Sequence, residues 1–545
     1  MYKILGSFLI VLTLLAGCGS GSGGGGGGGN NNIQAVSATN ADLSDLALSA
    51  GPLDQAFQAD QTSYTATVGF LNTVTTVTPT TDDVNATVTV NGAVVISGTA
   101  SGAISLDEGS NTITVIVTAE DGTTTKTYTV EVTRQTADSF AQQAYLKAIN
   151  ADASDLFGFS VAVSGDTLAV GAVGEGGADN SQPDAGAVYV FSRDNNGVWR
   201  QQDLLRALNA GARDQFGFSV ALSGDTLAVG AVGESGADNR KSDAGAVYVF
   251  GRDNSGEWHQ QGFLRAFNAD AGDLFGGAVA LSGDTLVVGA AGEGGADNRT
   301  PDAGAVYVFS RDNNGRWRQQ DFIRAFNGDT RDQFGFSVAL SSDTLAVGAV
   351  GEGRADNSKP DAGAVYVYTR DNNGLWRQQD FLRAFNADAG DLFGGAIALA
   401  GDTLAVGAVG KGSADNSKPD AGAVYVFSRD NNGLWRQQDF LRAFNADAGD
   451  LFGGAVALSG DTLAVGAVGN NGVGNLEPGA GAVYVFFRGD RVWRQQIILK
   501  AFNAEAGDLF GGAVALSGDT LAVGAVGEGG IDHGEPDAGA VYVFK

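Results

Sequence analysis

Acidic residues recur at fixed positions from residue 138 onward, and their types and spacing could hold a metal ion. Carboxylate oxygens are hard ligands, which Ca²⁺ prefers, and crowded carboxylates gain from a bound cation. The candidate metal ligands are Asp155, Glu175, Asp179, Asp184, Asp214, Glu234, Asp238, Asp243, Asp273, Glu293, Asp297, Asp302, Asp332, Glu352, Asp356 and Asp361. The alternative is a solvated acidic surface on which aspartates cap their own loops. Calcium is therefore the candidate ion, and no other cofactor is expected.

The sixth copy of the repeated sequence serves as an internal control for this hypothesis. It has Asn470, Gly474 and Gly479 where the first copy has acidic residues. If metal binds in this segment, the sixth copy should bind it least. The full list of paired positions is Glu175 with Asn470, Asp179 with Gly474 and Asp184 with Gly479.

Catalysis by histidine or cysteine has little support in this composition. The chain has one cysteine, Cys18, and two histidines, His259 and His533. Paired aspartates could indicate a glycosidase, in which two carboxylates flank one bond. However, near-identical loops occur in most copies, whereas an active site normally breaks such symmetry, and the clearest breaks are the acid losses in the sixth copy and Lys411. No catalytic residue is predicted, and the net charge of −29 argues against a nucleic-acid partner.

The N-terminus has the pattern of an export signal. Lys3 precedes an apolar stretch, residues 4–15, which is too short to span a membrane comfortably. It ends in Leu15-Ala16-Gly17-Cys18, which resembles the lipobox of bacterial lipoproteins. The resemblance implies a signal peptide over 1–17, acylation of Cys18, and anchoring at the outer membrane or cell surface. Residues 18–35 are glycine-rich and are expected to form a flexible tether.

Residues 36–135 are predicted to form a small antiparallel β-sandwich. Thr and Val alternate over 64–68, 86–90, 112–117 and 128–132, with turn signals between them. The order of features, including Val90-Asn-Gly92 and Gly109-Ser-Asn-Thr-Ile113, resembles the bacterial cadherin-like β-sandwich family. That resemblance implies a fold and a place outside the cytoplasm, and this domain is interpreted as a spacer. Asp121-Gly122 is expected to be a hairpin turn rather than a metal site.

Residues 138–545 contain seven copies of one unit, which together predict a closed seven-bladed β-propeller. Each unit has four candidate strands, and the second and third are apolar on both faces, as in a sheet packed between two others. The seventh unit lacks its fourth strand, and a matching segment lies near 141–148, which would complete that blade. The Phe-Gly pair that marks each unit begins at Phe157, Phe216, Phe275, Phe334, Phe393, Phe452 and Phe510.

The repeats resemble the FG-GAP family found in the integrin α-subunit. The Phe-Gly start, Leu-Ala-Val-Gly-Ala (168–172) and Gly-Ala-Val-Tyr-Val-Phe (186–191) carry the resemblance. Integrin-type repeats often have an Asp-rich calcium loop between the first two strands. Here that link is only Ser164-Gly-Asp-Thr167, so calcium is not expected at that place. Six tryptophans recur with the step of the repeat, 59 residues and once 58, and are expected to pack between blades rather than stack on sugars.

These features favour a non-enzymatic lipoprotein of the cell envelope, held at the membrane by its lipid. The acidic propeller face would bind a protein or glycan ligand in adhesion, with calcium as an aid. The alternatives are an envelope assembly scaffold and a polysaccharide hydrolase or lyase.

Overall fold

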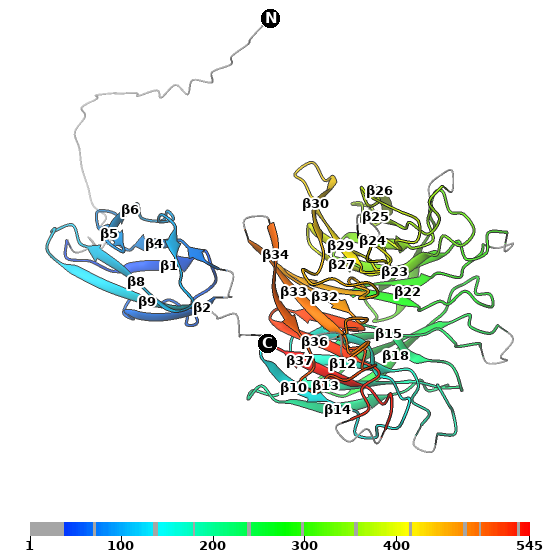
Figure 1. Ribbon diagram of the computed structural model, residues 1–545. Coiled ribbons are helices and arrows are strands. Elements are labelled where there is room, and N and C mark those ends of the chain that lie inside the picture. The colour runs from blue at the N-terminus through cyan, green and yellow to red at the C-terminus, as the bar shows by residue number, and fades with distance from the viewer. Residues whose placement is uncertain are drawn as a thin grey trace, which may run out of the picture. The chain divides into compact units, whose positions relative to one another are not determined.

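The computed structural model describes residues 38–68, 72–134, 140–177, 180–236, 241–295, 299–353, 358–413, 417–471, 477–489, 492–530 and 535–545. Every regular element of these ranges is a β-strand, and the chain folds into two compact units (Figure 1). The predicted signal peptide, Cys18 and the tether lie outside the described residues. The all-β prediction is confirmed.

The first unit is the small β-sandwich. Its main sheet has the order β2-β9-β8-β5-β6, and two short pairs, β1-β4 and β3-β7, complete it. The strands are β1 (Leu43–Leu48), β2 (Ser63–Val68), β3 (Val74–Thr75), β4 (Val77–Thr81), β5 (Thr87–Val90), β6 (Ala93–Val95), β7 (Ile104–Ser105), β8 (Gly109–Thr118) and β9 (Thr125–Arg134).

Alternating burial along these strands builds the core of the sandwich. In β2, for example, Tyr64, Ala66 and Val68 are buried and their neighbours are exposed. The tight turns follow the predicted chemistry: the Asp121 carboxylate accepts the backbone N–H groups of Thr123 and Thr124 at 2.8 and 2.7 Å. Asp121 therefore caps the turn between β8 and β9, as expected for a hairpin.

The second unit is the propeller, whose seven four-stranded sheets are its blades. The strands of a blade are called A to D in chain order. Strands A are β11 (Phe157–Ser164), β15 (Phe216–Ser223), β19 (Ala278–Ser282), β23 (Phe334–Ser341), β27 (Ile397–Ala400), β31 (Ala455–Ser459) and β35 (Ala513–Ser517). Strands B are β12 (Thr167–Ala172), β16 (Thr226–Ala231), β20 (Thr285–Ala290), β24 (Thr344–Ala349), β28 (Thr403–Ala408), β32 (Thr462–Ala467) and β36 (Thr520–Ala525).

The two later strands of each blade complete the meander. Strands C are β13 (Ala187–Arg193), β17 (Ala246–Arg252), β21 (Ala305–Arg311), β25 (Ala364–Arg370), β29 (Ala423–Arg429), β33 (Ala482–Gly489) and β37 (Ala540–Phe544). Strands D are β14 (Trp199–Leu205), β18 (Trp258–Leu264), β22 (Trp317–Ile323), β26 (Trp376–Leu382), β30 (Trp435–Leu441), β34 (Val492–Leu499) and, for the seventh blade, β10 (Gln142–Leu146).

Strand A begins later than predicted in four blades. Where the sequence reads Phe-Gly-Phe-Ser, the strand starts at the phenylalanine; where it reads Phe-Gly-Gly-Ala, it starts at the alanine or beyond. The serine of the longer version holds the strand against the next blade, since Ser160 Oγ donates to the Gly217 carbonyl at 2.7 Å. The second glycine removes a side chain that would otherwise support the strand.

Strands B are buried on both faces, which explains their near-continuous apolar sequence. Gly171 in β12 lies where two blades touch, and a Cβ there would stand 2.1 Å from the carbonyl oxygen of Gly217. Only glycine allows this approach of backbone to backbone. Each interface between blades is a separate apolar cluster, such as Val188, Leu205, Phe216 and Tyr248 between the first two blades.

A backbone bridge joins every blade to the next, and the bridges close the ring. Gly186 adopts a left-handed conformation (φ 82°), which orients it toward Phe216 of the next blade. The equivalent pair of the last and first blades is Gly539 with Phe157. The complete set is Gly186–Phe216, Gly245–Phe275, Gly304–Phe334, Gly363–Phe393, Gly422–Phe452, Gly481–Phe510 and Gly539–Phe157. The predicted closed seven-bladed propeller is confirmed.

The N-terminal strand β10 completes the seventh blade, as predicted. It pairs antiparallel with β37, with Tyr145 opposite Tyr542 (Figure 1). Phe140 packs on Phe487 at 5.9 Å between ring centroids. Because Phe140 precedes Trp199 by one repeat length, it takes the place of the missing seventh tryptophan.

The tryptophans pack between blades, as predicted. Five of them are 4–8% exposed, and Trp199 belongs to a cluster that contains Ala522 and Val541 of the seventh blade. Each tryptophan also carries an arginine over its ring, for instance Arg193 at 5.4 Å. The five buried rings are therefore covered and unable to stack on a sugar, and Trp317 is half-buried.

Candidate functional site

The loops of the propeller lie at its two ends. The B–C and D–A loops form one end, called here the loop face, and the A–B and C–D turns form the other, called the turn face. On the loop face, a glutamate follows strand B in five blades and is buried, with 2–4% exposed surface. These residues are Glu175, Glu234, Glu293, Glu352 and Glu528.

The fourth blade shows how such a glutamate is held. Glu352 Oε2 accepts hydrogen bonds from Tyr366 Oη at 2.8 Å and from Asn327 Nδ2 at 2.9 Å. Glu352 Oε1 accepts one from the Arg383 guanidinium at 2.5 Å. Tyr366 lies on β25, Asn327 on the D–A loop before the blade, and Arg383 directly after β26. The carboxylate thus ties the B–C loop to three other parts of its blade.

Three blades carry variants of this network, in which the residues at the glutamate or arginine position differ. In the seventh blade Lys147, which follows β10, replaces the arginine and pairs with Glu528 at 2.7 Å. In the sixth, Lys500 Nζ donates to Asn470 Oδ1 at 2.8 Å. In the fifth, Lys411 takes the glutamate position.

Lys411 is 4% exposed, and the two aspartates of its blade compensate its charge. Its ammonium pairs with Asp388 at 2.9 Å and with the buried Asp391 at 3.0 Å. The symmetry break that the sequence indicated at Lys411 is therefore a rearranged structural ion pair.

The predicted metal ligands fall into three groups with different positions. Asp155, Asp214, Asp273 and Asp332 are buried and cap their own D–A loop; Asp155 Oδ2, for example, accepts the N–H of Asp152 at 2.8 Å. Glu175, Glu293 and Glu352 form the network above, whereas Glu234 contacts Arg265 and accepts a hydrogen bond from the N–H of Gly236. The members outside the described residues are Asp179, Asp238, Asp297 and Asp356.

The third group serves the backbone. Asp184 adopts a left-handed conformation (φ 57°), and its carbonyl accepts the N–H of Gln215 in the next blade at 3.0 Å. Aspartate tolerates this conformation better than most residues. Gly479, which has φ 69° at this position in the sixth blade, needs no carboxylate for the purpose. The other members of this group are Asp243, Asp302 and Asp361.

The expectation that these carboxylates are solvated is therefore wrong for the buried aspartates and glutamates. The expectation that aspartates cap their own loops is confirmed. Calcium binding stays a prediction. An ion at Glu175 would have to displace Arg206, which pairs with its Oε1 at 2.9 Å, or the Tyr189 hydroxyl on its Oε2.

Burial shifts the pKa values of these groups. It raises the pKa of Asp155, Asp273 and Asp332 to about 6. Burial acts in the same direction on Glu175, but the hydrogen bonds from Tyr189, Gly177 N–H and Asn150 outweigh it, so the pKa of Glu175 is lowered. Tyr189 has a raised pKa because it is buried and donates to Glu175.

These shifts predict that mild acid stabilises the propeller. The three aspartates with a folded pKa of about 6 have a reference value of 3.8, so the folded state binds protons more tightly than the unfolded chain. Their stabilising contribution is complete below about pH 4 and is lost as the pH rises through 6. We expect the Tm to rise when the pH is lowered from 7.5 to 5.

Calorimetry across this range is the measurement. Backbone hydrogen bonds lower the pKa of Asp194, so its contribution to stability is lost only below its usual titration range. Its titration therefore does not affect the Tm between pH 7.5 and 5. The triple variant Asp155→Asn, Asp273→Asn, Asp332→Asn should show a flatter profile. A wild-type Tm that falls steadily from pH 7.5 to 5 would contradict the assignment.

The loop face also carries a ring of apolar side chains that the sequence analysis missed. One residue per blade, at the start of the D–A loop, is 64–87% exposed. In every blade it precedes the asparagine that accepts a hydrogen bond from the tyrosine of strand C, which places it on the loop face. The ring consists of Ile149, Leu208, Phe267, Phe326, Phe385, Phe444 and Phe502. A large apolar residue at each repeat between Ala and Asn was the available signal.

The turn face has a different character. Its arginines pair with aspartates of the A–B turns and also donate to the preceding blade. Arg193, for example, pairs with Asp166 of its own blade and donates to Thr520 Oγ1 of the seventh blade. Asp253, Glu257 and His259 also lie close together there, all exposed, with carboxylate and imidazole atoms that could hold a metal. In this set His259 Nε2 lies 2.9 Å from Asp253.

Seven segments of the chain match one described family, the FG-GAP repeat. They are residues 140–191, 199–250, 258–309, 317–368, 376–427, 435–486 and 493–544, well over half of the chain. The chain belongs to the FG-GAP repeat family. Residues 43–135 match the cadherin-like beta sandwich domain. Both family resemblances proposed from the sequence are confirmed, and each FG-GAP repeat runs from strand D of one blade to strand C of the next.

Individual proteins resemble parts of this FG-GAP repeat chain. A putative membrane protein of Evansella cellulosilytica is 45% identical over 106 residues, which cover 19% of this chain and 16% of that protein. The match thus spans a small part of its relative. In the described ranges, no helix is long and apolar enough to cross a bilayer.

Two solved structures are similar at low identity. A protein from Lactobacillus plantarum is 15% identical with a TM-score of 0.40, covering 66% of this chain and 88% of that one. The periplasmic gluconolactonase PpgL of Pseudomonas aeruginosa is 17% identical with a TM-score of 0.41, covering 62% and 87%. At this level of similarity neither structure says anything about the activity of the FG-GAP repeats here.

Proposed function

We propose that this chain is a non-enzymatic, lipid-anchored protein of the cell envelope that binds a protein or glycan ligand through the loop face of its propeller. The observation that carries the proposal is the exposed apolar ring. Seven large apolar side chains on one face, set among carboxylates, are a pattern of binding surfaces, because water-exposed aromatic groups gain most from being covered. Anchoring through Cys18 would hold the protein at the membrane.

The recurrence of one apolar side chain in every blade favours a role in adhesion. Each blade offers nearly the same anchor, so a ligand with repeated groups could contact several blades at once and gain affinity without new contacts. The buried glutamate networks hold the D–A loops in place, which reduces the entropy lost on binding. Calcium remains a narrower proposal for the same face.

Protease shaving of intact cells that express the full chain is the first test. Rapid loss of the propeller from whole cells would support adhesion. Protection until lysis would instead favour an assembly scaffold inside the envelope. Cys18→Ser should release the protein from the membrane fraction, which tests the anchor separately.

Photo-cross-linking in the same cells tests the face. A benzophenone amino acid replaces Phe326, Phe385 or Phe444 on the loop face, and in matched controls Leu375 or Leu434, which are 48% and 44% exposed on C–D turns of the turn face. We expect adducts of higher mass from the loop-face positions. Equal adducts from both faces, or adducts from the turn face alone, would contradict the proposal.

A further inference from the structure

One B–C loop position carries a lysine in the second, fourth and fifth blades. Each lysine reaches the D–A loop that leads into the next blade. Its ammonium donates to the carbonyl of an alanine and pairs with the aspartate that follows. The sets are Lys241–Ala269–Asp270, Lys359–Ala387–Asp388 and Lys418–Ala446–Asp447. The Nζ–Oδ1 distances are 3.4, 2.9 and 3.1 Å in that order.

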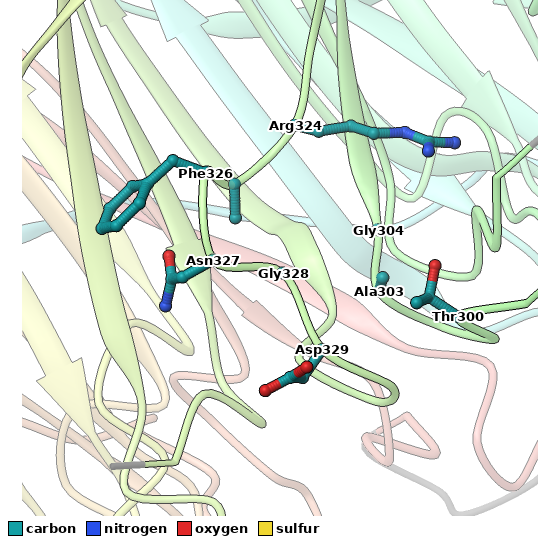
Figure 2. A pocket seen from close by; sticks show the side chains of 9 residues that line it. Thr300, Ala303, Gly304, Arg324, Phe326, Asn327, Gly328 and Asp329 are labelled. Carbon is teal, nitrogen blue, oxygen red and sulfur yellow. The ribbon is translucent and has the colours of Figure 1, made fainter. Parts of the chain in front are cut away.

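The third blade keeps the acceptors of this arrangement without its lysine. Thr300 takes the lysine position, Gly328 the alanine position and Asp329 the aspartate position. Both of the first two changes remove side-chain volume. A cavity of about 410 Å³ opens there, and Figure 2 shows Thr300 and Asp329 on two facing loops around it.

The polar groups of the wall other than Asp329 already have partners. Arg324 pairs with Glu293 at 2.5 Å, and Asn327 Nδ2 donates to Glu352. Thr300 Oγ1 donates to the Gly294 carbonyl at 3.2 Å. The Asp329 carboxylate, by contrast, has no ion pair with any described side chain. A positive group in the cavity would therefore meet Asp329 and the Gly328 carbonyl.

We propose that this cavity is a docking pocket for one lysine side chain of a protein partner. The lysines of the three other blades show what the pocket accepts: a butyl chain that ends in an ammonium, with one carbonyl and one carboxylate as acceptors. Ala303 and Ala325 line the cavity and offer apolar surface to the alkyl chain, whereas the ring of Phe326 points away from Thr300 (Figure 2) and packs on Tyr366 and Phe381. The inference rests on the proposed binding function of the loop face and names a partner group for it.

The remaining blades lack this combination. The first has Gln182 opposite Gly211, and the sixth has Glu477 opposite Glu505. In the seventh, Glu535 lies opposite Asp152. The third blade is thus the one in which a short neutral residue faces an aspartate. A partner that presents one lysine would find a single preferred position on an otherwise repeated ring, which fixes its rotation.

The test uses saturation-transfer difference NMR on the full chain in 150 mM salt. The probe is the peptide acetyl-Gly-Lys-Gly-amide, and its Nε-acetylated form is the control. We expect transfer to the lysine methylene protons of the probe and at least fivefold less to the control. Thr300→Lys, which fills the cavity as in three natural blades, should abolish the transfer, and Asp329→Asn, an exposed change, should weaken it at least fivefold.

A gain-of-site variant completes the design. Lys241→Thr with Ala269→Gly recreates the pocket in the second blade, where Asp270 has no other ion pair with a described side chain, and should about double the binding stoichiometry of the probe. Equal signals from both peptides, or an unchanged signal in Thr300→Lys, would overturn the inference. Cross-linking from Phe385, outside the pocket, distinguishes the two proposals: if it persists while the peptide fails to bind, the function stands and the lysine pocket falls.

Discussion

Replacing Arg383 by leucine should lower the free energy of unfolding by about 3 kcal/mol, the low end for a broken buried ion pair, since the arginine side chain is 28% exposed. The loss arises because Glu352 stays 4% exposed with an uncompensated charge. Tyr366 and Asn327 would still donate to it, but neither carries a positive charge. Urea and thermal unfolding followed by circular dichroism measure the change.

The sixth blade supplies the matched control. There an asparagine and a lysine replace the glutamate and the arginine, and they hydrogen-bond directly. The double variant Glu352→Asn, Arg383→Lys should therefore lie within about 1 kcal/mol of wild type, because no buried charge is left without a hydrogen-bonded partner. If Arg383→Leu and the double variant were equally destabilised, the ion pair would not be the cause.

Deleting residues 140–147 should have the larger effect, because it removes β10 from the seventh blade. Strand β37 would expose an edge of unpaired backbone groups, and Glu528, 2% exposed, would lose Lys147. The ion pair alone accounts for about 3–5 kcal/mol, and the burial of Leu146 adds about 2 kcal/mol. We expect a propeller that unfolds at much lower urea concentration and self-associates in size-exclusion chromatography.

A peptide tests whether the missing strand is the cause. Residues 140–148 added in trans should pair with β37 and restore the monomeric elution and the stability. The same peptide with Leu146→Asp should not, because the side chain of Leu146 is buried. A deletion variant as stable as wild type, with no response to either peptide, would show that β10 does not close the ring.

The fold could be predicted because its signals are local and repeated. Each unit shows apolar strands B and C and a Phe-Gly start, which predict a blade packed between two others. The segment near residue 142 matches the strand that the last unit lacks, which predicts how the ring closes. The boundary of strand A was missed in four blades because one glycine, as at Gly277, removes the side chain that supports the start of the strand.

The candidate site was less predictable because burial depends on how loops fold back. Glu175 appeared as one of many surface acids, yet its loop places it beneath Asn150, Tyr189 and Arg206. Covariation of the two positions gave no clear signal, since lysine replaces the arginine beside Asn470 and also beside Glu528. Conversely, Phe326 was not singled out from the sequence, and the structure shows its side chain to be exposed on the D–A loop.

The position of the closing strand has a genetic consequence. The two strands that seal the ring, β10 and β37, lie at opposite ends of the repeated region, and every unit between them is nearly interchangeable. An in-frame recombination that removes or duplicates one whole unit therefore leaves both sealing strands intact. Selection on blade number would then act through the angle between neighbouring blades, which sets how many units complete a circle, and not through the means of closure.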